Sequence, residues 1–457
     1  MSSKKGRVTV HSKLTVVSSK PIRPGTTHQL STLDHAMGLH TLHIVFYYKD
    51  NLFESFDLDP IRESLSNVIS LYPPVTGRLT RGDTGNWEVK CNDAGVRVRR
   101  ATVGATLDEW LRSADGSEET DLTMWEDMPH DPHMWSPFQI QINEFEGGGV
   151  AIGLSCSHMH ADTTSATLLF KSWAEAHLRK PLEHPPFFNP QALRGRPNPN
   201  THAKSIKSHS TMSKPRLSST ATFKFSNSVI QRCLTEVHED CPNATPFDLL
   251  AALFWTRVAR LKGLKNDSEQ YSLSICMDFR RQLQAPALPF GYFGNALHFS
   301  ELSLKGGEIG QATLGHVVQS VHSHVLGIEP EEFWTVIDWF EARKGEGGEF
   351  APPFRMYGPE LTCISLEHMV VTSGVAGSPT TSSLIYAVTF DKDIKPVHVS
   401  YHVGNVEGEG LIVIMPSSEE GISRTVMVTL PEKELAELCE DQAILRLEPT
   451  MLLSGKT

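Results

Sequence analysis

Two histidines and an aspartate share the short segment Ser-Cys-Ser-His158-Met-His160-Ala-Asp162. If the pattern is His-x-His-x-Asp, the segment supplies part of a metal site. If it is His-x-x-x-Asp, His158 is a general base and Asp162 shapes the turn by pairing with a distant arginine. An imidazole with an ordinary pKa of about 6.5 can take a proton from an alcohol or amine near neutral pH. That nucleophile would then attack a bound thioester directly, without a covalent intermediate on the protein.

The metal alternative needs more ligands than this segment supplies. Sites of the His-x-His-x-Asp-His type require a further histidine directly after the aspartate, and this chain has Thr163 there. His322 and His324 lie in a helical pattern that would turn their rings apart. We therefore expect no metal, and we expect His160 to face away from His158. The spacing alone is weak evidence for a base, because a chain with this many histidines and aspartates contains about one such pair by chance.

The composition limits the partners and the compartment. At 457 residues and 50.7 kDa the chain exceeds one ordinary core, so we expect two domains. A net charge of -11 argues against a nucleic-acid partner, because phosphate binding needs clustered lysine and arginine. Seven scattered cysteines without a C-x-x-C pair are typical of a reducing compartment. The sequence shows no signal peptide and no transmembrane segment, so we expect a cytosolic protein or one held at a membrane by a partner.

The His158 motif lies where a predicted strand meets a predicted helix. Apolar patterns predict strands at residues 138–145 and 150–157, joined by a Glu-Gly-Gly-Gly turn. Helical spacing follows over residues 163–178, with Thr163 or Thr164 as the expected N-cap. Backbone amides at such a helix start can support negative charge that develops during a reaction.

Strand and helix patterns mix along the rest of the chain, which indicates a two-layer α/β arrangement in each half. Helices are predicted at residues 31–40, 59–72, 227–237, 245–263 and within 309–345. Strands are predicted at residues 8–17, 43–49, 220–226, 271–280, 361–366, 384–391, 397–402, 411–415 and 424–429. A hairpin is predicted over residues 86–103. The aperiodic residues 185–220 are typical of a crossover, and their basic stretch 194–216 is typical of a solvated linker.

Five segments, in order along nearly the whole chain, resemble the plant BAHD acyltransferase superfamily. They are LYPPVTGRL (71–79), VKCNDAGVRV (89–98), GGGVAIGLSCSHMHAD (147–162), TPFDLLAALFWTRVAR (245–260) and MDFRRQLQAPALPFGYFGNAL (277–297). The resemblance implies an α/β (α+β) fold of two chloramphenicol-acetyltransferase-like domains, each a mixed sheet with helices, with a solvent channel between them. We therefore expect an N-terminal domain at residues 1–185, a crossover linker at 186–220 and a C-terminal domain at 221–457.

The same resemblance implies roles for individual residues. His158 matches the general base, Asp162 matches the structural acid, and Arg280 matches the arginine that pairs with this acid. Further residues of the matching segments would support the site, namely Asp278, Tyr292, Gly294 and Asn295. Acyl-CoA would be the co-substrate and would enter from one face, while the acceptor enters from the other. No cofactor is expected.

Two positions depart from the common family pattern. Thr163 stands where glycine usually follows the aspartate, and the "DFGWGKP" box, which is thought to affect the CoA side, reads TFDKDIKP at residues 389–396. At both departures the chain resembles the eceriferum (glossy-type) branch of the superfamily. Two further segments resemble the same branch, GTTHQLSTLDHAMGLHTLHIVFYYK (25–49) and YGPELTCISLEH (357–368). Proteins of that branch are associated with very-long-chain acyl extension for cuticular wax at the endoplasmic reticulum.

Three functions follow as hypotheses. In the first, the protein is an accessory protein that binds an elongase condensing enzyme or its very-long-chain acyl product and uses the acyltransferase fold as a scaffold. In the second, it is an active acyl-CoA-dependent O- or N-acyltransferase with His158 as general base. In the third, the fold binds a small molecule without an elongase partner. We expect a monomer that is cytoplasmic or peripheral to the endoplasmic reticulum.

Overall fold

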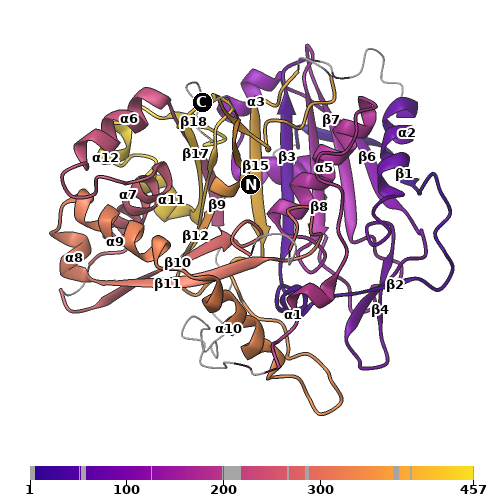
Figure 1. Ribbon diagram of the computed structural model, residues 1–457. Helices are drawn as coiled ribbons and strands as arrows, with labels where there is room; N and C mark the ends of the chain where they lie inside the picture. Colours follow the sequence, from indigo (N-terminus) through magenta and orange to yellow (C-terminus); the bar gives the residue numbers. More distant parts are fainter. Residues whose placement is uncertain are drawn as a thin grey trace.

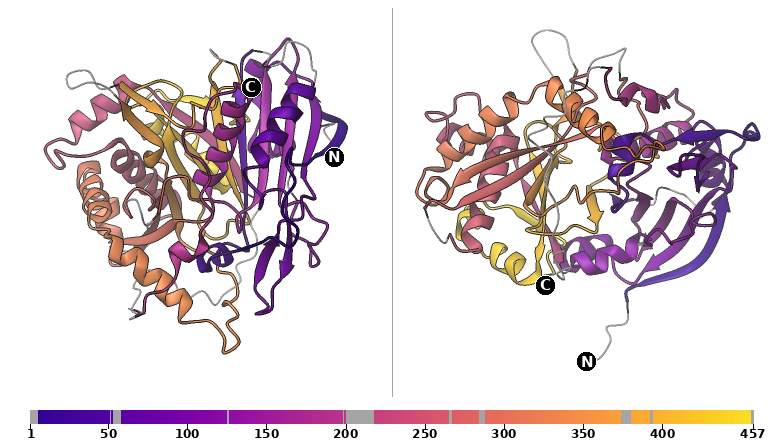
Figure 2. Two further views of the ribbon diagram at one scale, coloured as in Figure 1. Left: turned by 45° about the vertical axis from the view of Figure 1, so that its right-hand side comes forward. Right: turned by 90° about the horizontal axis from the view of Figure 1, so that it is seen from below.

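The computed structural model describes most of the chain as two packed halves (Figure 1). The described residues are 6–50, 52, 58–124, 126–197, 199, 218–264, 267–283, 288–373, 380–391 and 394–455. Most of the expected basic linker at 194–216, and two residues of the altered box at 389–396, lie outside them. Figure 2 shows, from below, the purple N-terminal half beside the orange and yellow C-terminal half.

A six-stranded mixed sheet forms the centre of the first half. Its strand order is β1 (Val8–Val16), β6 (Val96–Val103), β7 (Phe138–Phe145), β8 (Val150–Ser157), β3 (Thr41–Tyr48) and β15 (His398–Gly404). All residues of β3 and β8 are buried, as expected for central strands rich in β-branched and aromatic side chains. On one face the sheet packs against two helices that contact each other, α2 (Leu58–Ile69) and α5 (Thr163–His177). On the other face it packs against α3 (Leu107–Ser113) and the chain that follows, which includes α4 (Gly116–Glu119).

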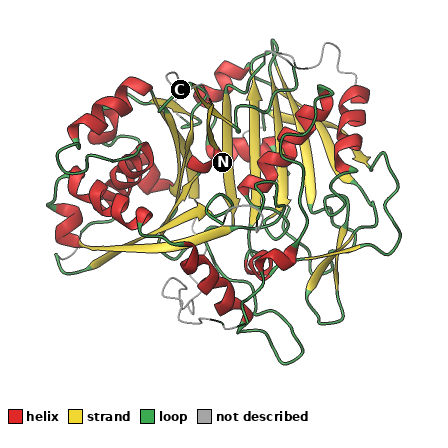
Figure 3. Cartoon of the chain, in the orientation of Figure 1, coloured by secondary structure: helices red, strands yellow, loops and turns green. Residues whose placement is uncertain are grey.

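A seven-stranded sheet forms the centre of the second half. Its strand order is β11 (Leu297–Lys305), β10 (Gln270–Asp278), β12 (Leu361–Ser365), β16 (Leu411–Pro416), β17 (Arg424–Pro431), β9 (Ser218–Phe225) and β18 (Thr450–Leu452). The outer face of this sheet is covered by helices, which gather on the left of Figure 3. They are α6 (Asn227–Glu236), α7 (Pro246–Leu261), α8 (Gly306–Gly310), α9 (Leu314–Leu326), α11 (Glu432–Leu438) and α12 (Gln442–Leu445).

One strand from late in the sequence completes the first sheet. β15 pairs with β3 in antiparallel register from His398 opposite Tyr47 to Gly404 opposite Thr41. In Figure 1 this yellow-orange strand lies directly beside the indigo strand β3. The expected C-terminal domain, residues 221–457, therefore contributes a strand to the sheet of the N-terminal half.

Several sequence-based predictions of elements need correction. The hairpin over 86–103 is wrong, because β5 (Trp87–Lys90) pairs with β2 (Thr27–Gln29) and β4 (Arg78–Arg81) in a separate three-stranded sheet. The strand at 384–391 is also wrong. A short strand, β14 (Thr380–Ser383), pairs with β13 (Val370–Ser373) just before it, and turns follow.

The remaining helix predictions are confirmed with shifted bounds. The helix expected at 31–40 is the single turn α1 (Thr32–Ala36), and the helical stretch at 309–345 contains α9 and α10 (Pro330–Glu341). Gly327 follows the end of α9. Pro330 begins α10, a position where its missing N–H costs no helix hydrogen bond. Within the described part of the chain, no helix has both the length and the apolarity to cross a bilayer. All seven cysteines are free and buried.

Candidate active site

His158 directly follows β8, and contacts from both halves hold its backbone. Its N–H donates to the carbonyl oxygen of His40 at 3.1 Å. Its carbonyl oxygen accepts from the Asn295 side-chain amide at 2.8 Å. Asn295 is itself fixed, because its backbone N–H and its side-chain amide both donate to Asp34 Oδ1 at 2.8 Å. The position of His158 therefore depends on residues distant in the sequence.

The imidazole of His158 is sealed from solvent. Its exposed fraction is 0%, so the expected solvent channel does not reach the ring in this conformation. Nε2, the nitrogen that a general base would use, lies 2.8 Å from the Tyr357 hydroxyl oxygen. Burial lowers the pKa of His158, and its own carbonyl, Asp162 and Asn295 only partly oppose this effect. The ring is therefore neutral near pH 7.

Asp162 shapes the turn between β8 and α5. Its Oδ1 accepts from the Ser165 N–H at 2.8 Å, which makes Asp162 the N-cap of the helix. The prediction of Thr163 or Thr164 as N-cap is therefore wrong. Its Oδ2 accepts from Arg280 Nη1 at 2.7 Å and from the Ala296 N–H at 3.0 Å. These contacts give the carboxylate a structural position, at the junction of the two halves.

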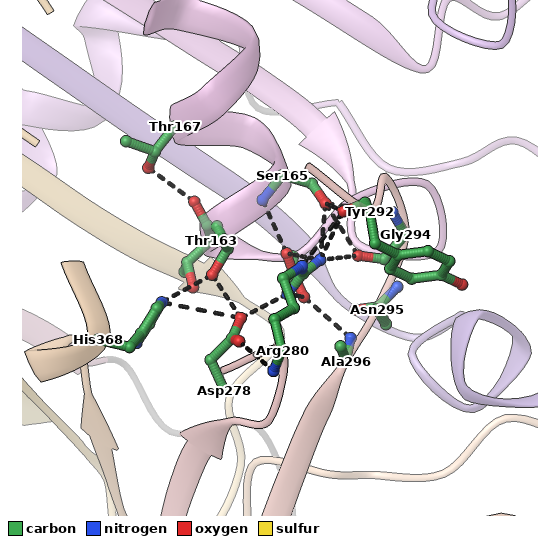
Figure 4. Close-up of polar contacts among 12 residues, drawn as sticks. Thr163, Ser165, Thr167, Asp278, Arg280, Tyr292, Gly294, Asn295, Ala296 and His368 are labelled. Carbon is green, nitrogen blue, oxygen red and sulfur yellow. Dashed lines mark hydrogen bonds and ion pairs between the residues drawn. The ribbon is translucent and has the colours of Figure 1, made fainter. Parts of the chain in front are cut away.

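Arg280 is the centre of this junction (Figure 4). Besides Asp162, its guanidinium forms a close ion pair with Asp278. It also donates to the carbonyl oxygens of Tyr292 at 3.0 Å and Gly294 at 2.9 Å. Burial opposes the charge of Arg280, but the two carboxylates hold its pKa above the ordinary value. All of its donor directions therefore point at fixed acceptors.

Asp278 ends β10 and connects the ion pair to α5. Its Oδ2 accepts from the Thr164 hydroxyl at 2.6 Å and lies 3.7 Å from His368 Nε2. Burial raises the pKa of Asp278, but Arg280, His368 and the hydrogen bonds from Thr164 and the Arg280 N–H together lower it overall. Asp278 is therefore ionised, and the network carries two carboxylates for one guanidinium.

Gly294 sits where a larger residue would meet the Tyr292 ring. Its φ is +146°, and a Cβ at this position would lie 3.0 Å from the Tyr292 hydroxyl oxygen. This backbone conformation presents the carbonyl of Gly294 to Arg280. Tyr292 packs its own ring near the guanidinium, with 5.6 Å between the ring centroid and Arg280 Cζ.

The structure thus brings all the sequence-predicted site residues into one buried cluster, while their catalytic or structural roles stay predictions. Sequence reasoning missed Tyr357, Asp34 and Ser165 as members of the cluster. The Ser31–Asp34 capping box marks the start of α1 and was visible as a helix signal. No local signal connects Tyr357 to His158, because 199 residues separate them.

His160 does not take part in the site. It is 3% exposed and packs edge-on against Phe138, with 5.8 Å between the ring centroids. Neither ring nitrogen has a hydrogen-bond partner among the described residues, and burial lowers the pKa to about 3. Across the described ranges, no three His, Cys, Asp or Glu side chains come together as metal ligands would.

Comparison with known families agrees with this geometry. The model of the Transferase family matches residues 6–445. This chain belongs to the Transferase family of BAHD acyltransferases. The mixed α/β fold with two sheet-containing domains, expected from the sequence, is confirmed for this BAHD protein.

Similar proteins cover most of the BAHD chain. Protein ECERIFERUM 26-like from Arabidopsis thaliana is 25% identical over 93% of this chain and 92% of its own length. Fatty alcohol:caffeoyl-CoA acyltransferase from Arabidopsis thaliana is 27% identical over 72% of this chain and 79% of its own length. The crystal structure of vinorine synthase superposes with a TM-score of 0.69 at 16% identity, covering 96% of this chain and 98% of that chain.

Proposed function

We propose that this BAHD protein promotes the extension of very-long-chain acyl groups for cuticular wax, acting at the endoplasmic reticulum beside an elongase condensing enzyme. The observation that carries the proposal is the state of His158. Its Nε2 is buried and already hydrogen-bonded to Tyr357, so the imidazole is not free to activate an acceptor. The similarity to an ECERIFERUM 26-like protein over 93% of the chain supports the same conclusion.

A scaffold role accounts for the presence of Asp162 and Arg280 in a protein whose His158 is not free to act as a base. Asp162 belongs to the first half and Arg280 to the second, so their ion pair holds the halves together. Removing one partner of a buried ion pair typically costs about 3–5 kcal/mol, because the other charge is left uncompensated. The network therefore serves the fold whether or not chemistry occurs.

The test is the acyl chain length in yeast that expresses a plant elongase condensing enzyme alone or together with this protein. We expect the wild-type protein to shift the fatty acid methyl esters, measured by gas chromatography, toward longer chains. His158→Ala should retain this shift. His160→Ala is the matched control, because it removes another buried imidazole two residues away. An unchanged chain length with the wild-type protein would contradict the proposal.

A second candidate is an acyl-CoA-dependent O- or N-acyltransferase. The observation in its favour is that His158, Asp162 and Arg280 lie in one buried cluster, and a fatty alcohol:caffeoyl-CoA acyltransferase is 27% identical over 72% of the chain. Release of CoA from acyl-CoA in the presence of long-chain alcohols or amines would measure this activity. If the wild-type protein has it, His158→Ala should lower the rate about 100-fold or more.

A further inference from the structure

The hydroxyl group of Tyr357 occupies the position that a substrate acceptor would need. A general base takes a proton from a group about 2.6–3.2 Å from its nitrogen, and the Tyr357 oxygen lies 2.8 Å from His158 Nε2. Two hydroxyl oxygens cannot share this place. An alcohol, amine or water molecule can therefore reach the base only if the phenol leaves.

The ring of Tyr357 is held on several sides. It packs edge-on against His40, with 5.0 Å between ring centroids, and against Phe299, with 5.3 Å. Its backbone carbonyl accepts from the Glu407 N–H at 3.3 Å. The side chain is 0% exposed. His40 belongs to the first half and Phe299 lies on β11 of the second, so the ring is fixed between both halves.

The hydrogen bond joins two neutral groups. Burial raises the pKa of Tyr357 well above its ordinary value and lowers the pKa of His158. Nδ1 of His158 has no hydrogen-bond partner among the described residues, and in the tautomer with the proton on Nδ1 the ring accepts the phenolic hydrogen at Nε2. A proton transfer would create a buried imidazolium and a buried phenolate, both of which burial disfavours. The Tyr357 hydroxyl group therefore blocks Nε2 of His158, but it keeps its proton and does not act as a nucleophile.

We propose that Tyr357 is an internal occupant of the acceptor position, and that its hydroxyl group prevents His158 from activating water or an alcohol against an acyl thioester. This inference does not depend on the partnership with an elongase. It predicts a latent hydrolytic activity toward long-chain acyl-CoA that appears when the hydroxyl group is removed.

The chemistry of that latent activity follows from the space vacated. Tyr357→Phe keeps the ring but leaves Nε2 without its hydrogen-bond donor, and Tyr357→Ala also vacates the space of the ring. An unpaired buried acceptor with room beside it favours a water molecule. His158 then takes a proton from this water as its oxygen bonds to the thioester carbonyl carbon. The carbon–sulfur bond breaks, and the imidazolium returns the proton to the CoA thiolate. The products are a free fatty acid and CoA.

The experiment measures free thiol release from stearoyl-CoA by the purified full-length protein, without an elongase. We expect Tyr357→Phe to release CoA at least about 10-fold faster than the wild-type protein, since general-base catalysis contributes about 10²–10⁴-fold. The double variant Tyr357→Phe/His158→Ala should fall back to the wild-type rate. Tyr401→Phe is the matched control, because it removes another buried hydroxyl, bonded to Thr167 at 2.8 Å, and should leave the rate unchanged.

Two outcomes would overturn the inference. One is that the folded variants Tyr357→Phe and Tyr357→Ala, verified by thermal unfolding, both release CoA no faster than the wild-type protein. The other is an acyl mass added to Tyr357 of the wild-type protein, detected by peptide mass spectrometry, since Tyr357 would then be an acceptor. Tyr357→Ala belongs in this test because it removes the ring as well as the hydroxyl group. None of these outcomes bears on chain extension in yeast, so the two proposals fail separately.

Discussion

At the scale of single residues, Arg280 is the cation that makes the site possible. It is 1% exposed and pairs with Asp162 and Asp278, so two buried carboxylates depend on one guanidinium. Loss of Arg280 leaves both carboxylates uncompensated. Loss of the Asp162 charge instead leaves a neutral Arg280–Asp278 pair. Substitutions of Arg280 and of Asp162 should therefore lower the free energy of unfolding by different amounts, although both break the same contact.

We predict that Arg280→Met lowers the free energy of unfolding by about 3–5 kcal/mol. Asp162→Asn should cost less, about 1–3 kcal/mol, because it mainly weakens hydrogen bonds to the helix start and to Arg280. Urea denaturation followed by circular dichroism measures both. Lys395→Met is the control, since its ion pair with Glu420 is 62% and 64% exposed and should contribute less than about 1 kcal/mol. A larger cost for Asp162→Asn than for Arg280→Met would contradict this explanation.

At the scale of elements, β8 controls where His158 is placed. Gly153 lies in the middle of this strand, against the turn of chain after α4. A Cβ at Gly153 would lie 2.3 Å from the Leu122 carbonyl oxygen and 2.8 Å from Thr123 Cγ2. The strand and the chain that covers it therefore approach each other more closely than any side chain allows.

We predict that Gly153→Ala destabilises the protein by about 1–3 kcal/mol, as overpacking of a core typically does. Gly104→Ala is the matched control, because a Cβ there would meet no atom of the described residues closer than 3.7 Å and its φ is not in the left-handed region. Thermal unfolding of the two variants gives the comparison. Equal midpoints for both would show that the turn moves away at little cost.

The same elements show what the sequence could and could not predict. The strands of 138–157 and the helix after them follow from local periodicity, so they were predicted correctly. The hairpin at 86–103 failed because the partners of β5 are β2 and β4, a choice made by non-local packing. The prediction of Thr163 or Thr164 as the N-cap failed because Asp162 both caps the helix and binds Arg280. Tyr357 has no period or motif of its own that points to His158.

At the scale of the whole molecule, buried imidazoles make stability depend on pH. Burial is the main cause that lowers the pKa of His40 and His160 to about 3, and of His35 and His398 to about 4. In the unfolded chain each has a pKa of about 6.5, so between these values the unfolded state binds more protons. The stability that these four neutral histidines contribute is therefore fully present above pH 6.5 and is lost as the pH falls toward 4. Asp34 acts in the opposite direction, because burial raises its pKa.

We predict that the free energy of unfolding falls between pH 6.5 and 4.5, with each buried imidazole contributing up to about 1.4 kcal/mol per pH unit. Guanidinium unfolding at several pH values measures the slope. His160→Leu should reduce the slope by about one proton, since it removes one titrating ring while it keeps an apolar side chain beside Phe138. An identical slope in this variant would show that His160 does not resist protonation in the folded state.

The placement of β15 has a consequence for the time course of synthesis on the ribosome. Until residues 398–404 leave the exit tunnel, β3 has no neighbour on one side. The nascent first half then carries an open edge whose residues are all buried in the folded protein. Such an edge pairs readily with other chains. β3 therefore lacks this neighbour while residues 49 to 404 are translated, and chaperones that cover the edge would determine how much of the chain matures.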